Sequence, residues 1–225
     1  RKAVVERFKP EKQIPEIFTA IEMLDMLSLQ DLVTNDKSVV ESQFKGETPM
    51  LRLVTDFLKV VEKEQLVETE NDNDNNDDDD DSKSTTGTTF LDMLQLLLEA
   101  GADPDAVYDA SKISSGGSSG VISKEEEPLL QICRTLHRIH RKNYELQQRN
   151  DGKEEKTSHN NSNIETLETA AELLIVAGAK KHVSCPAAII KMLLEAARRG
   201  EIKMVQFLIE KVKMNPNSHG IQGMT

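Results

Sequence analysis

The sequence predicts an all-α fold in which short helical units stack on one another. An apolar helical run that ends in a small-residue turn occurs three times, at residues 94–103, 173–180 and, in a looser form, 207–215. Aromatic residues make up only 4% of the chain and Trp is absent, which leaves a core of aliphatic side chains that suits thin stacked helices. A unit too small to bury its own apolar face has to stack against copies of itself. We therefore expect the protein to work through an extended surface.

Composition argues against several classes of protein. The net charge is −11 and the pI is about 5.0, whereas a nucleic-acid-binding domain more often has a basic face and a high pI. Residues 71–81 contain seven Asp, so much of this charge is local. Cys133 and Cys185 are the only cysteines, and they match neither a disulfide framework nor a zinc motif. No run of 18 apolar residues is present, so we expect no membrane span.

Reduced cysteines and the absence of a signal peptide predict an intracellular protein, located in the cytoplasm or the nucleus. Because the chain begins with Arg1 rather than Met, we expect it to be a fragment of a longer protein.

Hydrophobic periodicity and turn residues predict the order of the elements. Helices are expected at 1–30 (with a break between Pro10 and Pro15), from Pro49 with Thr48 as N-cap, from Phe90 to Gly101, and at about 127–149, 164–177, 187–199 and 201–213. We expect a loop at 31–45, and polar stretches at 68–89, 109–123 and 150–163 that have too few apolar residues to fold. Glycines at 101 and 178 predict left-handed helix caps.

Three sets of residues share one spacing. The first unit opens with Gly46-Glu47-Thr48-Pro49-Met50-Leu51 and closes with Gly101-Ala102-Asp103. The second opens with Pro128-Leu129-Leu130 and closes with Ala177-Gly178-Ala179, and the third contains Leu193, Ala196, Ala197 and Gly200 before an apolar second helix. These units resemble ankyrin repeats, in which Gly-x-Thr-Pro-Leu-His starts a helix pair and Gly-Ala-Asp follows it.

The resemblance implies an ankyrin-like helical repeat solenoid with two long insertions. It implies an N-terminal helical cap or degenerate repeat at 1–43, repeats at 44–108, 123–182 and 187–218, and the truncated start of another repeat at 219–225. An acidic insertion at about 62–89 and a polar one at about 143–163 both fall between the two helices of a repeat. A longer loop adds little closure entropy at such a position.

The chain departs from the family pattern at two kinds of position. The motif His is replaced by Leu51, Leu130 and Leu194, and Asn215-Pro216 comes one residue late, which predicts a longer last helix. The small side chains of Ala196 and Ala197 are expected to let neighbouring helix pairs approach closely.

Cys133, His137 and His140 lie at i, i+4 and i+7 on one helical face. A metal site or a thiolate–imidazole pair is one interpretation, but no fourth ligand is evident. The favoured interpretation is a buried structural Cys beside surface histidines.

The acidic run starts an EF-hand-like spacing with Asp72, Asp74 and Asn76. The motif fails because Asp77 stands where Gly is required and Lys83 stands where Glu is required. We therefore expect no bound metal, no cofactor and no catalytic residue, and so no enzyme.

A basic stripe consists of Arg134, Arg138, Arg141 and Lys142. Three interpretations stay open: phosphate binding, an ordinary solvated face, and contact with the acidic insertion.

The resemblance implies that partners dock on the loop tips and on the exposed side of each first helix. By motif position these residues are Lys45, Glu47, Lys124, Glu126, Arg134, Arg198, Arg199, Ile221, Gln222 and Met224. We expect a monomeric, non-catalytic scaffold or adaptor that binds other proteins and no nucleic acid. The alternative is a regulatory ankyrin segment of a larger enzyme or channel, whose catalytic or membrane domain lies outside this chain.

Overall fold

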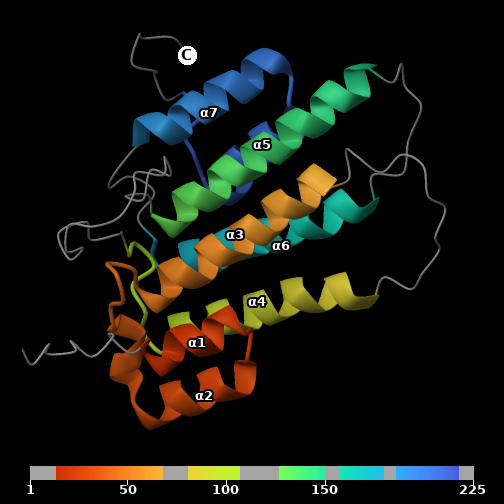
Figure 1. The fold of residues 1–225 in the computed structure, drawn as a ribbon. Coiled ribbons are helices and arrows are strands. Elements are labelled where there is room, and N and C mark those ends of the chain that lie inside the picture. The colour runs from red at the N-terminus through yellow and green to blue at the C-terminus, as the bar shows by residue number, and fades with distance from the viewer. Residues whose placement is uncertain (1–13, 68–80, 107–126, 150–157, 180–185, 218–225) are drawn as a thin grey trace, which may run out of the picture.

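The computed structural model describes residues 14–67, 81–106, 127–149, 158–179 and 186–217, and this part of the chain is all-helical (Figure 1). The prediction of an all-α fold is confirmed for these residues. The elements are α1 (Glu16–Glu22), α2 (Met26–Asn35), the 3-10 helix η1 (Lys37–Glu41), α3 (Pro49–Val67), α4 (Asp81–Glu99), α5 (Pro128–Arg149), α6 (Ser158–Val176), α7 (Pro186–Arg199), α8 (Ile202–Gln206) and the π-helix η3 (Phe207–Lys211).

The helices pack in alternation along the chain. The odd-numbered helices α1, α3, α5 and α7 each contact the next odd-numbered one, and Figure 1 shows them in succession from bottom to top. The even-numbered helices form a second series, in which α2 contacts α4, α4 contacts α6 and α6 contacts η3. Each odd-numbered helix also contacts the helix that follows it. Every helix pair therefore lies against the next pair.

One apolar cluster runs through all the pairs, from Ile17 in α1 to Met214 after η3. Its fully buried side chains include Leu53 in α3, Leu97 in α4 and Leu136 in α5. Between α3 and α4, the rings of Phe57 and Phe90 stack with centroids 3.9 Å apart and an interplanar angle of 5°. Aliphatic side chains supply most of this core, as the low aromatic content predicts.

Glycines in the left-handed region end three helices in the same way. After α4, Gly101 has φ +96° and the following N–H, of Ala102, donates to the Leu97 carbonyl at 2.9 Å. Gly178 (φ +100°) ends α6 with the same bond pattern, and Gly200 (φ +76°) ends α7. This is the Schellman cap, in which a Cβ would be strained at the glycine position. The predicted caps at Gly101 and Gly178 are confirmed.

The start of α3 also agrees with its prediction. The helix begins at Pro49, and the Thr48 hydroxyl oxygen accepts a hydrogen bond from the Leu51 N–H at 3.3 Å. Thr48 therefore caps the helix and leaves proline, which has no N–H, at the first helical position.

The N-terminal region differs from its prediction. The predicted loop at 31–45 is largely helical, because α2 extends to Asn35 and η1 follows it. Helices α1 and α2 are separated at Met23–Asp25, where Leu24 adopts a φ of +51°. The separation divides six apolar residues that recur at helical spacing in this region: Ile17, Phe18 and Ile21 are buried, whereas Ile14, Leu24 and Leu27 are exposed.

Both predicted insertions are shorter in the structure, since residues 62–67, 81–89, 143–149 and 158–163 are helical. Tertiary contacts explain these extended ends. The Asn163 amide donates to Glu64 at 3.0 Å, which joins α6 to the end of α3. Gly87 allows α4 to lie close to α6, because a Cβ there would stand 2.9 Å from the Thr166 hydroxyl oxygen. Residues 68–80, 109–123 and 150–157 lie outside the described residues.

The last helix differs from its prediction in its winding and in its end, because it stops at Lys211 rather than at residue 213. Helix α8 continues into η3, where the Val212 N–H donates to the Phe207 carbonyl at 3.1 Å, an i to i−5 bond. A π-turn holds one more residue than an α-turn, so the helix is wider than the predicted α-helix over 201–213. Only one of the two predicted close-packing alanines is buried: Ala196 is, whereas Ala197 is exposed.

The Gly101 cap gives a stability test. We expect Gly101→Ala to lower the free energy of unfolding by about 1 kcal/mol, because the left-handed conformation is strained for a residue with a Cβ. A steric clash would not contribute to the loss, since a Cβ at this position meets nothing within 4 Å. Urea denaturation measures the loss. Gly101→Asn is the control and should lose less, because Asn tolerates positive φ; equal losses would contradict the explanation.

Candidate functional site

The face of α5 that carries Cys133, His137 and His140 is covered. Helix α5 contacts α3, α6, α7 and α8, and the exposed fractions of these residues are 0%, 9% and 6%. The prediction of a buried Cys is confirmed, and that of surface histidines is wrong. Burial raises the pKa of the Cys133 thiol to about 12, so it stays protonated at neutral pH and is a poor nucleophile.

His137 faces the buried carboxylate of Glu201. Glu201, the N-cap residue of α8, has a side chain that is 1% exposed, and its Oε2 lies 3.5 Å from His137 Nε2. Its Oε1 lies 3.8 Å from Arg199 Nη1. Neither carboxylate oxygen accepts a hydrogen bond from a described residue. Burial lowers the pKa of His137, and the Glu201 charge opposes this only in part.

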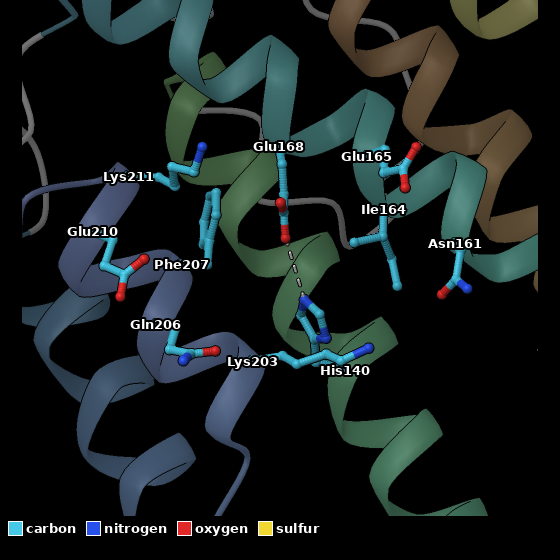
Figure 2. A pocket seen from close by; sticks show the side chains of 10 residues that line it. All are labelled: His140, Asn161, Ile164, Glu165, Glu168, Lys203, Gln206, Phe207, Glu210 and Lys211. Atoms are coloured by element: carbon cyan, nitrogen blue, oxygen red, sulfur yellow. Dashed lines mark ion pairs between the residues drawn. The ribbon is translucent and has the colours of Figure 1, made fainter.

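A cavity of about 390 Å³ lies between α5, α6 and the α8–η3 segment (Figure 2). Helix α5 contributes His140, and α6 contributes Asn161, Ile164, Glu165 and Glu168. The α8–η3 segment contributes Lys203, Gln206, Phe207, Glu210 and Lys211. The inner lining consists of the buried His140, Ile164 and Phe207, and the exposed charged residues form the rim.

His140 points its Nε2 atom towards Glu168, at 3.9 Å from Oε1 (Figure 2). This distance is too long for a hydrogen bond, and Nε2 has no hydrogen-bond partner among the described residues. Burial lowers the pKa of His140 to about 4, and the charge of Lys203 adds to the effect. The imidazole is therefore neutral at pH 7. Burial raises the pKa of Glu168.

Within the described ranges, no three His, Cys, Asp or Glu side chains are placed to hold a metal ion together. The acidic run at 72–81, whose EF-hand spacing fails, is outside the described residues except for Asp81, the first residue of α4.

The first predicted loop tip is a tight turn. The N–H of Phe44 donates to the Glu47 carbonyl at 3.0 Å, and the reverse bond measures 3.1 Å. Lys45 (φ +54°) and Gly46 (φ +84°) form the centre, and positive φ at both central residues defines a type I′ turn. The Lys45 ammonium lies 5.1 Å from the centroid of the Phe44 ring. The turn therefore presents Lys45 at its exposed tip.

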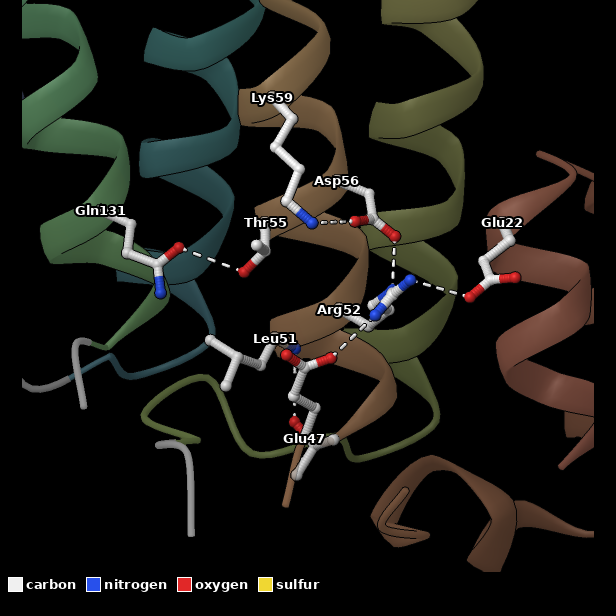
Figure 3. Close-up of polar contacts among 9 residues, drawn as sticks. Glu22, Glu47, Leu51, Arg52, Thr55, Asp56, Lys59 and Gln131 are labelled. Carbon is white, nitrogen blue, oxygen red and sulfur yellow. Dashed lines mark hydrogen bonds and ion pairs between the residues drawn. The ribbon is translucent and has the colours of Figure 1, made fainter. Parts of the chain in front are cut away.

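Arg52 joins this turn to two helices (Figure 3). Its guanidinium pairs with Glu47 of the turn at 3.1 Å, Glu22 of α1 at 2.8 Å and Asp56 of α3 at 2.5 Å. Burial lowers the pKa of Arg52, but the hydrogen bonds with Glu47 and Asp56 and the charges of these two carboxylates outweigh it and raise the pKa. The arginine thus stays charged and holds α1, the turn and α3 in register.

The predicted basic stripe lies on α5 and contacts its neighbours. Arg138 pairs with Glu62 of α3, and Arg141 pairs with Glu145 on α5 itself at 2.9 Å. Gln131 of α5 accepts a hydrogen bond from the Thr55 hydroxyl of α3 at 3.3 Å (Figure 3). Part of the stripe therefore joins α5 to α3. Phosphate binding and contact with the acidic insertion stay predictions.

The predicted partner-binding residues have different environments. Lys45 and Arg198 are exposed, whereas Glu47 is engaged by Arg52, Arg134 is half-buried and Arg199 lies near Glu201. Lys124, Glu126, Ile221, Gln222 and Met224 lie outside the described residues. Sequence reasoning missed the cavity, because its lining comes from three helices that no motif connects.

Comparisons with known proteins give no relative. No protein-family model, no curated protein and no solved structure matches this chain. In the described part of the chain, no helix has both the length and the apolar character needed to cross a membrane.

The buried imidazole predicts acid sensitivity. His140 has a folded-state pKa of about 4 against an ordinary value of 6.5, so the unfolded chain takes up a proton first as the pH falls. Stability is full above pH 6.5 and is lost as the pH falls towards 4. We expect His140 to account for about 2 kcal/mol of lost unfolding free energy between pH 7.5 and pH 5. Urea denaturation at both pH values measures it.

His140→Gln is the control for this test. It should lose less unfolding free energy over the same pH interval. Glu168 and His137 titrate in both proteins, so most of their contribution cancels when the loss in the variant is subtracted from the loss in the native chain. An equal loss in both proteins would show that another group is responsible.

The Arg52 network predicts a second stability effect. Arg52→Ala removes three ion pairs that join α1, the turn and α3, and we expect a loss of about 1 kcal/mol that shrinks at high salt. Lys59→Ala is the matched control, because Asp56 is the only described residue with which Lys59 pairs, and the Lys59 side chain is 54% exposed. Urea denaturation at low and high salt compares them; losses of similar size would contradict a special role for Arg52.

Proposed function

We propose that this protein is a non-catalytic scaffold or adaptor made of ankyrin-like repeats, and that it binds other proteins through its loop tips and first helices. The observation that carries the proposal is the alternating packing, in which first helices contact first helices and second helices contact second helices. A stack of this kind depends on contacts between neighbouring units and leaves one side of every first helix open.

Local features support the same proposal. Leu51 and Leu130, which replace the motif His, are 2% and 4% exposed, so they serve as core residues where the family has a polar side chain. The caps after α4 and α6 occur at equivalent positions of two units. The type I′ turn at Phe44–Glu47 precedes the first helix α3, as the tip of an ankyrin-like unit would.

The open side of the first helices favours an acidic partner. The exposed charged side chains of α3, α5 and α7 are mainly basic: Lys59, Lys63, Arg138, Arg141, Glu145, Lys191 and Arg198. Basic side chains on one face attract an acidic segment and raise its association rate. We propose that the partner presents such a segment.

The proposal is tested by capture of partners from a cell lysate with the immobilised chain, at moderate salt, followed by mass spectrometry. We expect Lys45→Glu/Arg198→Glu to lose partners that the native chain retains, because both residues are exposed on the proposed surface. Arg199 is left unchanged, since it lies 3.8 Å from the buried Glu201 carboxylate.

Lys37→Glu/Lys213→Glu is the control, with the same change in net charge at exposed residues after α2 and after η3. It should retain the partners. Identical capture by all three proteins would exclude this surface, and loss in both variants would indicate an effect of net charge alone.

A further inference from the structure

The cavity between α5, α6 and the α8–η3 segment contains an unsatisfied polar atom. His140 lines the cavity and is 6% exposed, its Nε2 atom has no hydrogen-bond partner among the described residues, and this atom points towards Glu168 of the same lining (Figure 2). Buried polar atoms are nearly always hydrogen-bonded, because an unpaired one costs about 1–3 kcal/mol. A group that enters the cavity and bonds to Nε2 would recover this cost.

The nearest fixed group is a hydrogen-bond acceptor. Glu168 Oε1 lies 3.9 Å from His140 Nε2, and a carboxylate accepts but does not donate. The neutral imidazole offers Nε2 as an acceptor when its proton is on Nδ1. One N–H donor group between the two atoms would satisfy both of them, whereas an anion there would meet the Glu168 charge.

The lining holds three carboxylates and two ammonium groups. The carboxylates are Glu165, Glu168 and Glu210, and of the two lysines, Lys211 forms an ion pair with Glu172 of α6. Lys203, Glu165 and Glu210 are exposed at the rim, where solvent screens them, so the half-buried Glu168 is the charge that acts most strongly on a group in the cavity. The buried Phe207 ring also lines the cavity and adds an aromatic surface of the kind that cations contact (Figure 2).

The backbone gives independent support. Phe207, Glu210 and Lys211 belong to the π-helix η3, and π-turns occur often at functional sites. The volume of about 390 Å³ is sufficient for a long basic side chain together with the atoms next to it.

We propose that this cavity binds an organic cation with N–H donors, a primary ammonium or a guanidinium group, seated between the Glu168 carboxylate and His140 Nε2. The inference does not rest on the scaffold function, because the cavity includes none of the residues assigned to the loop tips.

The experiment is an NMR titration that follows the His140 ring signals. The probes are the amide-blocked derivatives of arginine and lysine, with blocked citrulline and blocked Nε-acetyl-lysine as neutral counterparts of similar shape. We expect saturable shifts with at least one charged probe and none with its neutral counterpart. Agmatine and putrescine form a second arm: binding of these amines alone identifies a small-molecule ligand, and binding of the blocked amino acids alone identifies a protein side chain.

Glu168→Gln should weaken binding of the charged probe by about tenfold or more, which is the loss of affinity expected for one charge-assisted hydrogen bond. Asp92→Asn is the matched control, because it removes one negative charge from an exposed position of α4, and its affinity should equal that of the native chain. Glu210→Gln, at the exposed rim, is a second test that does not disturb the buried lining. It should weaken binding by about twofold, and less at high salt.

Three results would overturn the proposal. They are equal binding of the charged and neutral probes, unchanged affinity in both Glu168→Gln and Glu210→Gln, and the absence of saturation at His140 with every cationic probe.

Discussion

Packing of each helix pair against the next is the constraint on which the rest of the structure depends. Residues such as Leu97 and Leu136 are completely buried, and the cluster that contains them extends through every pair. A pair taken alone would expose part of this surface to water, at a cost of roughly 25 cal/mol for each Å². The Schellman caps serve the same end, because they turn the chain sharply after a helix and bring the next segment back onto the stack.

Close packing also creates the polar features in the C-terminal half. Because α6, α7 and α8 cover α5, they enclose His137, His140 and Glu201, whose side chains carry charge or hydrogen-bonding groups. The Arg52 network at the other end is half-exposed and fully paired. The two regions thus differ in kind: Arg52 ties elements together, whereas His140 and Glu201 have buried polar atoms with no hydrogen-bond partner in the described part of the chain. Unpaired buried atoms are the better indication of a binding site.

Sequence reasoning was accurate where a local motif fixes a local conformation. Thr48-Pro49 predicted the start of α3, and Gly101 and Gly178 predicted caps, since backbone sterics alone decide these positions. It was less accurate at 81–89 and 31–45, where composition favoured loops. There α4 is extended by packing against α6, and α2 and η1 rest on the core through Val33 and Val40. His137 and His140 were wrongly predicted to lie on the surface, because the sequence of a single helix gives no information about which other helices will cover it.

The sequence by itself determined the all-α class, the aliphatic core and the caps at Gly101 and Gly178, because each depends on residue type and short-range spacing. The tertiary structure decided the π-winding of η3 and which charged side chains meet. It also decided the cavity, where His140 meets Glu168, Phe207 and Lys203 from α6, η3 and α8. Such a site depends on the relative placement of helices, which follows from burial of the whole apolar surface and from no single segment.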